Sequence, residues 1–265
     1  VHAASRFNEG FVILMNRVPG DSRLPRNDHE VIREMVKSLI GAVARLHSIS
    51  STDLKLAWGD VDSIHDGVIR ELRIWRHLVD MSSDPVSDFA FRWLESHINN
   101  LVGVDLPASL VQGDTGPGNA VFHEGQLTAL VDWELAHLGD PMQDIAWIIT
   151  RCRQYGGVVD SDFIRGWYDQ VSARPSDSAR IAYQSVFVNL KCVIITARTI
   201  AEGGGALGLN PYQLAHQRFR REVIDAIANA DNREIESAHA ASSRIATKVG
   251  LTEDVLSEMR SALAP

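Results

Sequence analysis

A chain of 265 residues with 45% hydrophobic residues is long enough to bury a substantial core, and its 23% charged content excludes wholesale disorder. The net charge of −8 argues against nucleic acid as a partner and would suit a cationic small molecule. The two cysteines match no metal spacing, and no secretory signal opens the chain. The longest apolar window, residues 186–200, is interrupted by Asn189, Lys191 and Arg198, so we expect a cytoplasmic protein with no membrane partner.

The N-terminal third predicts one strand followed by helices. Phe11 to Met15 is an apolar run bounded by glycine and proline, which predicts a buried strand that leaves into a turn. Asp28 is expected to cap a helix that ends near His47. The apolar face of this helix is formed by Val31, Met35, Leu39, Val43 and Leu46. Two further helices are expected over residues 66–79 and 88–98.

The middle of the chain changes to short strands and then returns to helices. Strands are predicted at 109–111, 120–122 and 127–131, with residues 123–126 as the turn between the last two. Asp140-Pro141 is a favourable helix start, which predicts a helix through about residue 153. Later helices are expected over 160–171, 176–201, 211–230 and 252–263, with Gly203–Gly205 as a connection. The pattern therefore predicts an α+β fold that is predominantly helical and carries a small strand-and-loop insert.

That insert places three oxygen-bearing side chains around tight turns. Asp114 and Asn119 enclose the segment Gly116-Pro117-Gly118, and Asp132 follows the predicted hairpin. We expect this loop to be non-helical, with glycines that let a ligand approach the backbone closely. Carboxylate and amide oxygens suit Mg²⁺ bound together with phosphates better than Zn²⁺.

The spacing of these residues predicts phosphoryl transfer. An Asp followed by four residues and an Asn, with a later metal-binding Asp, is the arrangement of a kinase catalytic loop. Asp114 would accept the proton of an attacking hydroxyl, while Asn119 and Asp132 would hold Mg²⁺ against the polyphosphate. Taken alone, Asp114 would be interpreted as a turn stabiliser.

The surrounding residues strengthen this hypothesis through a resemblance to a family. The chain resembles the aminoglycoside phosphotransferase and choline kinase-like family, which are small-molecule kinases with a protein-kinase-like fold. The matching residues are Gln112-Gly113-Asp114, Asn119, Asp132-Trp133-Glu134, Gly139-Asp140-Pro141 and Asp144. The resemblance implies ATP and Mg²⁺ as cofactors and a small-molecule hydroxyl as acceptor.

The resemblance also implies how the chain is divided and where ligands bind. Residues 1–20 would be a remnant of the N-terminal lobe, with Met15, Asn16 and Val18 at the adenine. Residues 21–265 would form the C-terminal lobe, with the catalytic loop at 110–134, substrate-side helices at 139–230 and a helical tail at 231–265. The acidic residues suggested for a cationic acceptor are Asp160, Asp162, Glu202 and Glu222. Because few residues precede Phe11, we expect most of the N-terminal lobe to be absent and nucleotide affinity on this chain to be poor.

Several residues near the motifs have simpler explanations. Gln112 replaces the family's usual histidine and is expected to brace the loop rather than perform chemistry. Asp140 is explained by helix capping, and Asp144 by holding the catalytic loop's backbone, as the resemblance implies. Glu134 would touch the metal or lie at the surface. The aromatic residues expected in the core are Trp58, Trp75, Trp93, Trp133 and Trp147, and His123 is expected in a solvated turn.

Two alternatives stay open from the sequence. The chain could be a catalytically degenerate kinase-fold protein that binds a partner, or a metal-dependent hydrolase that uses the same aspartates. The motif is shared by kinases of aminoglycosides, amines, sugars and macrolides, so it leaves the acceptor open, together with the oligomeric state and the choice of ATP or GTP.

Overall fold

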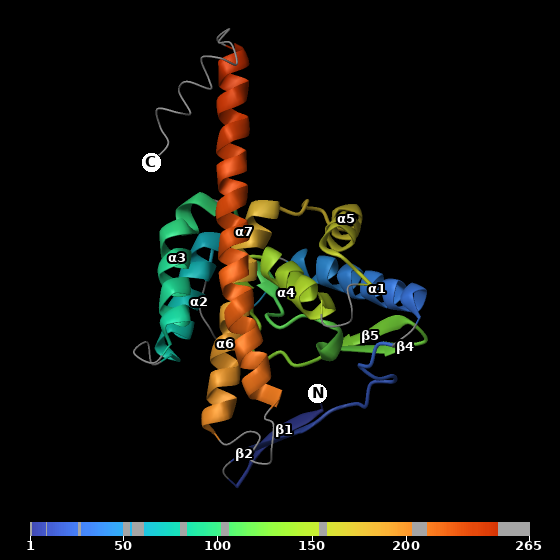
Figure 1. The fold of residues 1–265 in the computed structure, drawn as a ribbon. Helices are drawn as coiled ribbons and strands as arrows, with labels where there is room; N and C mark the ends of the chain where they lie inside the picture. Colours follow the sequence, from blue (N-terminus) through green and yellow to red (C-terminus); the bar gives the residue numbers. More distant parts are fainter. Residues whose placement is uncertain are drawn as a thin grey trace. The chain divides into compact units, whose positions relative to one another are not determined.

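The computed structural model describes residues 2–8, 10–25, 28–49, 54, 61–79, 84–101, 106–153, 158–202 and 211–248 (Figure 1). The chain forms two compact units: unit 1 contains residues 1–78 and 98–177, and unit 2 contains residues 79–97 and 178–265. The boundaries expected from the sequence at residues 20, 139 and 230 do not coincide with these limits and stay predictions. The helix predicted at 252–263, the Gly203–Gly205 connection and Trp58 lie outside the described residues.

Unit 1 begins with a hairpin in which β1 (Ala3–Phe7) pairs antiparallel with β2 (Gly10–Leu14). The strand predicted from Phe11 onward is therefore confirmed, but its predicted burial is wrong. The side chains from Val12 to Met15 are 53–62% exposed. The reason is that β1 and β2 pair with no other strand among the described residues, and a two-stranded ribbon alone buries little side-chain area.

Helix α1 (His29–His47) is capped as predicted, since the Asp28 carboxylate accepts a hydrogen bond of 3.1 Å from the Val31 N–H. Of the predicted apolar face, Met35, Leu39, Val43 and Leu46 are buried, whereas Val31 is 39% exposed. A step of four residues advances about 40° beyond a full helical turn, so a stripe of such steps drifts around the helix. Val31 consequently lies at the margin of the face centred on Leu39 and Val43.

The predicted strands form two more antiparallel pairs in unit 1. β4 (Ala120–His123) pairs with β5 (Gln126–Leu130), and β3 (Ser109–Val111) pairs with β6 (His137–Gly139). The sequence analysis missed β6, because three residues are too short a run to show an alternating pattern. Helix α2 (Ile64–His77) packs on β6 at Gly67, where a Cβ atom would lie 2.7 Å from the Leu138 carbonyl oxygen.

The remaining helices of unit 1 follow these strands. α4 (Met142–Arg153) begins after Asp140, whose Oδ1 accepts a hydrogen bond of 2.9 Å from the Met142 N–H. α5 (Ser161–Val171) is capped by Asp160 through the Phe163 N–H at 2.8 Å. Both helix starts therefore lie within two residues of their predicted positions, because short polar side chains ahead of an apolar run are strong capping signals.

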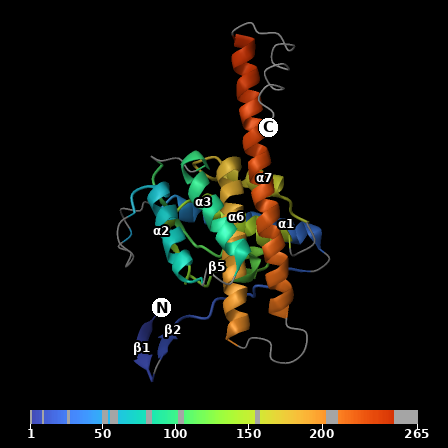
Figure 2. The ribbon, with the colours of Figure 1, turned by 60° about the vertical axis from the view of Figure 1, so that its left-hand side comes forward.

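Unit 2 consists of α6 (Ser178–Ala201), α7 (Pro211–Lys248) and most of α3 (Pro85–Leu101). α6 and α7 lie side by side in both views of the ribbon (Figures 1 and 2). The Trp93 indole N–H donates a hydrogen bond of 2.8 Å to Asp231, and the Tyr183 hydroxyl donates one of 3.0 Å to the Leu94 carbonyl oxygen. α7 continues well beyond the predicted end at Ala230. Among the described helices, none is both long and apolar enough to cross a membrane.

Candidate active site

The segment from Gln112 to Asn119 leaves β3 as a tight loop. Gly113 has φ +88°, and a Cβ atom at this position would lie 2.2 Å from the Leu135 carbonyl oxygen. Pro117–Asn119 form a single 3₁₀ turn, closed by the Asn119 N–H on the Gly116 carbonyl oxygen at 3.0 Å. The expectation of a wholly non-helical loop is therefore wrong for these three residues, because Pro at the first position favours such a turn.

The 3₁₀ turn brings Asn119 back onto Asp114. The Asn119 Nδ2 group donates to the Asp114 carboxylate at 2.7 Å and to the Asp114 carbonyl oxygen at 2.9 Å. Since both partners can only accept, they fix which end of the carboxamide is the nitrogen. The Asn119 Oδ1 atom therefore points away from Asp114 and is available to a ligand.

Arg151 is a site residue that the sequence analysis missed. Its guanidinium group forms an ion pair with Asp114 Oδ1, and it lies over the Trp147 ring at 5.1 Å. Gly116 makes this approach possible, because a Cβ atom there would lie 2.6 Å from the Arg151 Cγ atom. A signal existed, since Arg151 lies seven residues, or two helical turns, after Asp144 on α4 and so shares its face.

The buried carboxylate of Asp144 holds the start of the loop. It accepts backbone hydrogen bonds from Gln112 at 2.9 Å and Gly113 at 3.0 Å, and one from the Thr115 hydroxyl at 2.6 Å. His47 Nε2 lies 3.1 Å from it. Complete burial would raise the pKa of Asp144, but the hydrogen bonds and charge of His47, together with Thr115 and the Gly113 amide, outweigh burial and hold the pKa below its usual range.

Gln112 braces the loop from inside, as expected. Its Oε1 accepts from the Asp114 N–H at 2.9 Å and from the Thr115 hydroxyl at 3.0 Å. Its Nε2 donates to the carbonyl oxygens of Val131 at 3.0 Å and Asp132 at 2.6 Å. One fully buried side chain therefore connects the loop that carries Asp114 to the segment that carries Asp132.

Asp132 lies beside this loop but does not join the contact between Asp114 and Asn119. Its neighbour Val131 donates a backbone hydrogen bond of 2.9 Å to Asn119, while the Asp132 side chain is exposed and bonds to neither residue. Its φ of +60° is uncommon for a residue with a Cβ atom. Such backbone strain recurs at ligand-binding positions.

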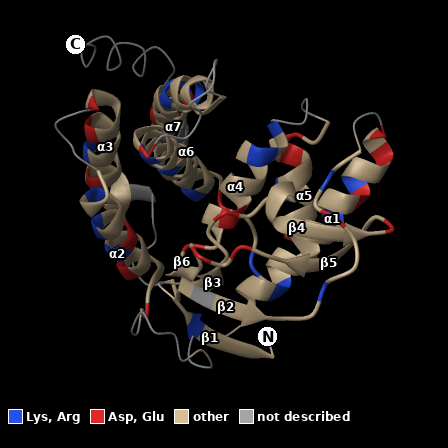
Figure 3. Ribbon diagram, turned by 90° about the horizontal axis from the view of Figure 1, so that it is seen from below, with Lys and Arg blue, Asp and Glu red and all other residues tan. Residues whose placement is uncertain are grey.

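The donor set around the loop fits a hard divalent cation. Asn119 Oδ1 and the Asp132 carboxylate are oxygen ligands of the kind that Mg²⁺ takes together with substrate phosphates. Among the described residues, no three His, Cys, Asp or Glu side chains gather in a way that could hold a metal ion. Such a site would therefore need oxygens from outside the chain, as an Mg²⁺–polyphosphate complex supplies. Figure 3 shows acidic segments in the loops next to β3, β6 and α4.

The residues predicted at the nucleotide lie between β2 and an anchored turn. Asn16 accepts a hydrogen bond from His2, Met15 is exposed, and Val18 is half-buried. After them, Asp21 exchanges two backbone hydrogen bonds with Phe122 at 3.0 and 2.8 Å. The end of this segment is thus fixed to β4, which follows the 3₁₀ turn directly.

The remaining predicted residues fall into two groups. Trp75, Trp93 and Trp147 are buried as expected, but Trp133 is 42% exposed, because it lies in the loop after β5, where its indole N–H bonds to the Leu130 carbonyl oxygen. Each acidic residue suggested for a cationic acceptor already has a local role. Asp160 caps α5, and ion pairs join Asp162 to Arg165, Glu202 to Arg198 and Glu222 to Arg218.

Comparison with known proteins agrees with the motif analysis. The model of the family described as "Phosphotransferase enzyme family" matches residues 1–177. The mouse protein acyl-CoA dehydrogenase family member 10 is 28% identical over 169 residues, which cover 59% of this chain and 15% of that protein. Mouse acyl-CoA dehydrogenase family member 11 is 34% identical over 117 residues, covering 41% of this chain and 14% of that protein. The chain thus corresponds to a small part of these relatives.

Solved structures establish the fold. A Ralstonia eutropha protein provisionally described as an aminoglycoside phosphotransferase superposes with a TM-score of 0.62 at 21% identity, covering 84% of this chain and 72% of its own. The choline kinase LicA of Streptococcus pneumoniae gives 0.56 at 16% identity, with coverage of 86% and 74%. The expected α+β, predominantly helical fold with protein-kinase-like relatives is therefore confirmed.

Proposed function

The chain belongs to the phosphotransferase enzyme family, and from this premise we propose that it transfers the γ-phosphoryl group of ATP to a hydroxyl group of a small molecule, with Mg²⁺ as the metal. The observation that carries the proposal is the contact between Asp114 and Asn119. It fixes the Asp114 carboxylate and turns the Asn119 amide oxygen away from it, on a loop that is held at both ends.

Asp114 is the proposed base. One carboxylate oxygen accepts a hydrogen bond from the Asn119 side chain, and the other forms the ion pair with Arg151. Each oxygen keeps a second lone pair that can accept a hydrogen bond from the hydroxyl of the substrate. The ion pair with Arg151 also holds the Asp114 carboxylate in one orientation until the hydroxyl arrives. General-base catalysis of this kind contributes about 10²–10⁴-fold to the rate.

Asn119 and Asp132 are the proposed metal ligands. Mg²⁺, when bound, would neutralise polyphosphate oxygens and align the transferred group. The chain's own contribution is to present Asn119 Oδ1 in a fixed direction and an exposed Asp132 carboxylate on a neighbouring strand end. Met15, Asn16 and Val18 remain the proposed contacts for the adenine.

We propose that the acceptor is a small hydroxylated molecule that also carries a cationic group. A net charge of −8 favours such a molecule electrostatically. Among the structural relatives, one aminoglycoside phosphotransferase was solved with ADP and hygromycin B, and another is a choline kinase. We place the reaction in the cytoplasm, since the chain's two cysteines are buried and form no disulfide with each other.

The test is ADP formation by the complete protein that contains this chain, measured with ATP and Mg²⁺ across a panel of small alcohols. We expect at least one acceptor to stimulate ADP formation, and Asp114→Asn to abolish that stimulation. Asp62→Asn, which removes an exposed carboxylate just before α2, is the matched control and should change nothing. Phosphate release without any acceptor would indicate a hydrolase instead. Absence of any Mg²⁺-dependent thermal shift with ATP would indicate a degenerate binding protein.

A further inference from the structure

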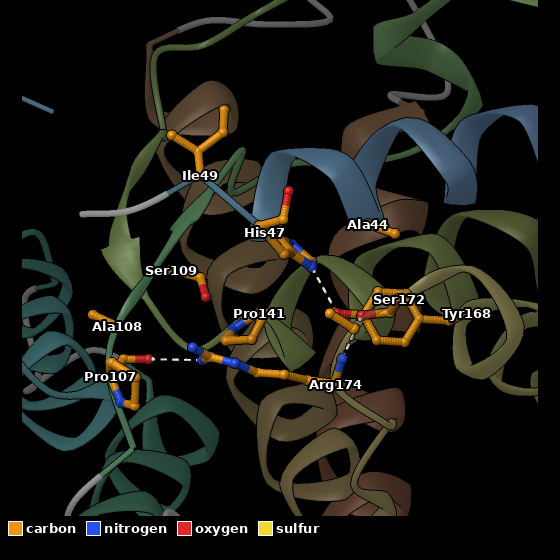
Figure 4. Close-up of a pocket in the computed structure, with 12 residues that line it drawn as sticks. Ala44, His47, Ile49, Pro107, Ala108, Ser109, Pro141, Tyr168, Ser172 and Arg174 are labelled. Carbon is orange, nitrogen blue, oxygen red and sulfur yellow. Dashed lines mark hydrogen bonds between the residues drawn. The ribbon is translucent and has the colours of Figure 1, made fainter. Parts of the chain in front are cut away.

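A cavity of about 430 Å³ lies in unit 1, between the end of α1, the segment before β3 and the end of α5. Its lining includes Ala44 and His47 from α1, Pro107 and Ser109 beside β3, and Tyr168 on α5 (Figure 4). This volume is in the range of sites that bind small molecules. None of the proposed catalytic, metal or nucleotide residues lines it.

The lining of the cavity favours an anion. Arg174 extends across it, and no Asp or Glu is among the twelve described residues that line it (Figure 4). Within the described part of the chain, the Arg174 guanidinium group donates one long hydrogen bond of 3.3 Å, to the Pro107 carbonyl oxygen. A carboxylate in the cavity would offer this guanidinium group a shorter, charge-assisted bond. The alanine and proline side chains of the lining would contact the apolar part of such a molecule.

One lining residue connects the cavity to the catalytic loop. His47 is buried, with Nδ1 at 2.9 Å from the Tyr168 hydroxyl and Nε2 at 3.1 Å from Asp144. Asp144 is held ionised and can only accept, so His47 donates to it from Nε2, while Nδ1 forms the hydrogen bond with the Tyr168 hydroxyl. The Asp144 carboxylate also accepts hydrogen bonds from the amides of Gln112, on the oxygen that faces His47, and of Gly113; both residues directly precede Asp114.

We propose that this cavity is a second binding site for a small organic anion, and that its occupancy is transmitted through Tyr168, His47 and Asp144 to the catalytic loop. The anion accepts hydrogen bonds from Arg174 and from the Tyr168 hydroxyl. Redirecting that hydroxyl breaks its hydrogen bond with His47 Nδ1 and so alters the hydrogen bond between His47 and Asp144. Binding is independent of the proposed phosphotransfer, so either can fail without the other.

Binding is tested with benzoate as the probe and benzamide as its neutral isostere, titrated into the full chain by calorimetry. Benzoate should bind with one-to-one stoichiometry and at least about tenfold more tightly than benzamide, because only benzoate forms a charge-assisted pair. Arg174→Gln should weaken benzoate about tenfold, whereas Arg73→Gln, an exposed residue of α2 outside the lining, should not. Ala173→Trp should weaken the binding of both probes, because it places a large side chain on a residue that lines the cavity. Unchanged benzoate binding in Ala173→Trp would overturn the site.

Transmission is tested by the amide NMR signals of Gln112 and Gly113 in the same titration. They should shift with benzoate in the native protein and stay in place in Tyr168→Phe at saturating benzoate. This variant keeps the buried ring and loses only the hydroxyl. Shifts that persist in Tyr168→Phe, or that never reach these two amides in the native protein, would overturn the relay. Circular dichroism of each variant confirms that it is folded.

Discussion

Asp144→Asn provides the sharpest test of how the catalytic loop is held. The two carboxylate oxygens of Asp144 accept hydrogen bonds from the backbone N–H groups of Gln112 and Gly113, the Thr115 hydroxyl and His47 Nε2. The side chain is completely buried. An asparagine has one acceptor oxygen, so its NH₂ group must face donors on one side of the site. If the oxygen keeps Gly113 and Thr115, the amide of Gln112 loses its acceptor.

The magnitude follows from the bonds that are lost. A hydrogen bond to a charged group contributes about 1.5–3 kcal/mol, and a buried donor without a partner costs a further 1–3 kcal/mol. We therefore expect Asp144→Asn to lower the free energy of unfolding by about 3 kcal/mol or more, out of the roughly 5–15 kcal/mol typical of a native protein. Urea unfolding followed by circular dichroism measures this, with Asp62→Asn as the exposed control within about 0.5 kcal/mol of wild type. A loss under about 1 kcal/mol would show that Asp144 does not support the loop.

Four further outcomes are expected. The pKa of Asp144 is lower in the folded than in the unfolded protein. Its contribution to the free energy of unfolding is therefore complete above about pH 4 and is lost as the pH falls through the folded pKa. Asp144→Asn should consequently flatten the acid side of a plot of stability against pH. Gly113→Ala should destabilise by more than about 1 kcal/mol in urea unfolding, since φ is +88° and Leu135 blocks the Cβ position. Asn119→Ala should raise the Mg²⁺ concentration required for half-maximal ADP formation, and an unchanged requirement would remove Asn119 from the metal site. Burial raises the pKa of the Cys152 thiol to about 12, so labelling by a thiol reagent at pH 8 should be far slower in folded than in urea-unfolded protein.

Local sequence signals were sufficient for most elements of the fold. Asp28 and Asp160 cap helices because a short carboxylate can reach the free N–H groups of the first turn, whatever the rest of the chain does. The β4–β5 hairpin was likewise predicted from a polar turn between two apolar runs. The spacing of Asp114 and Asn119 predicted that their side chains converge, and they do, because an Asp and an Asn five residues apart can meet across a single turn.

Burial and long-range partners were decided only by the tertiary structure. The apolar residues of β2 are exposed, although the sequence predicted that they are buried. A run of apolar residues shows that a segment could be buried, but not which other segment would cover it. Arg151 reaches Asp114 from 37 positions away, and His47 reaches Asp144 from 97, so neither contact has a local pattern. The sequence alone determined which groups could do the chemistry. Packing between distant segments determined how those groups are held, because the free energy that orients a buried side chain comes from the partners that surround it.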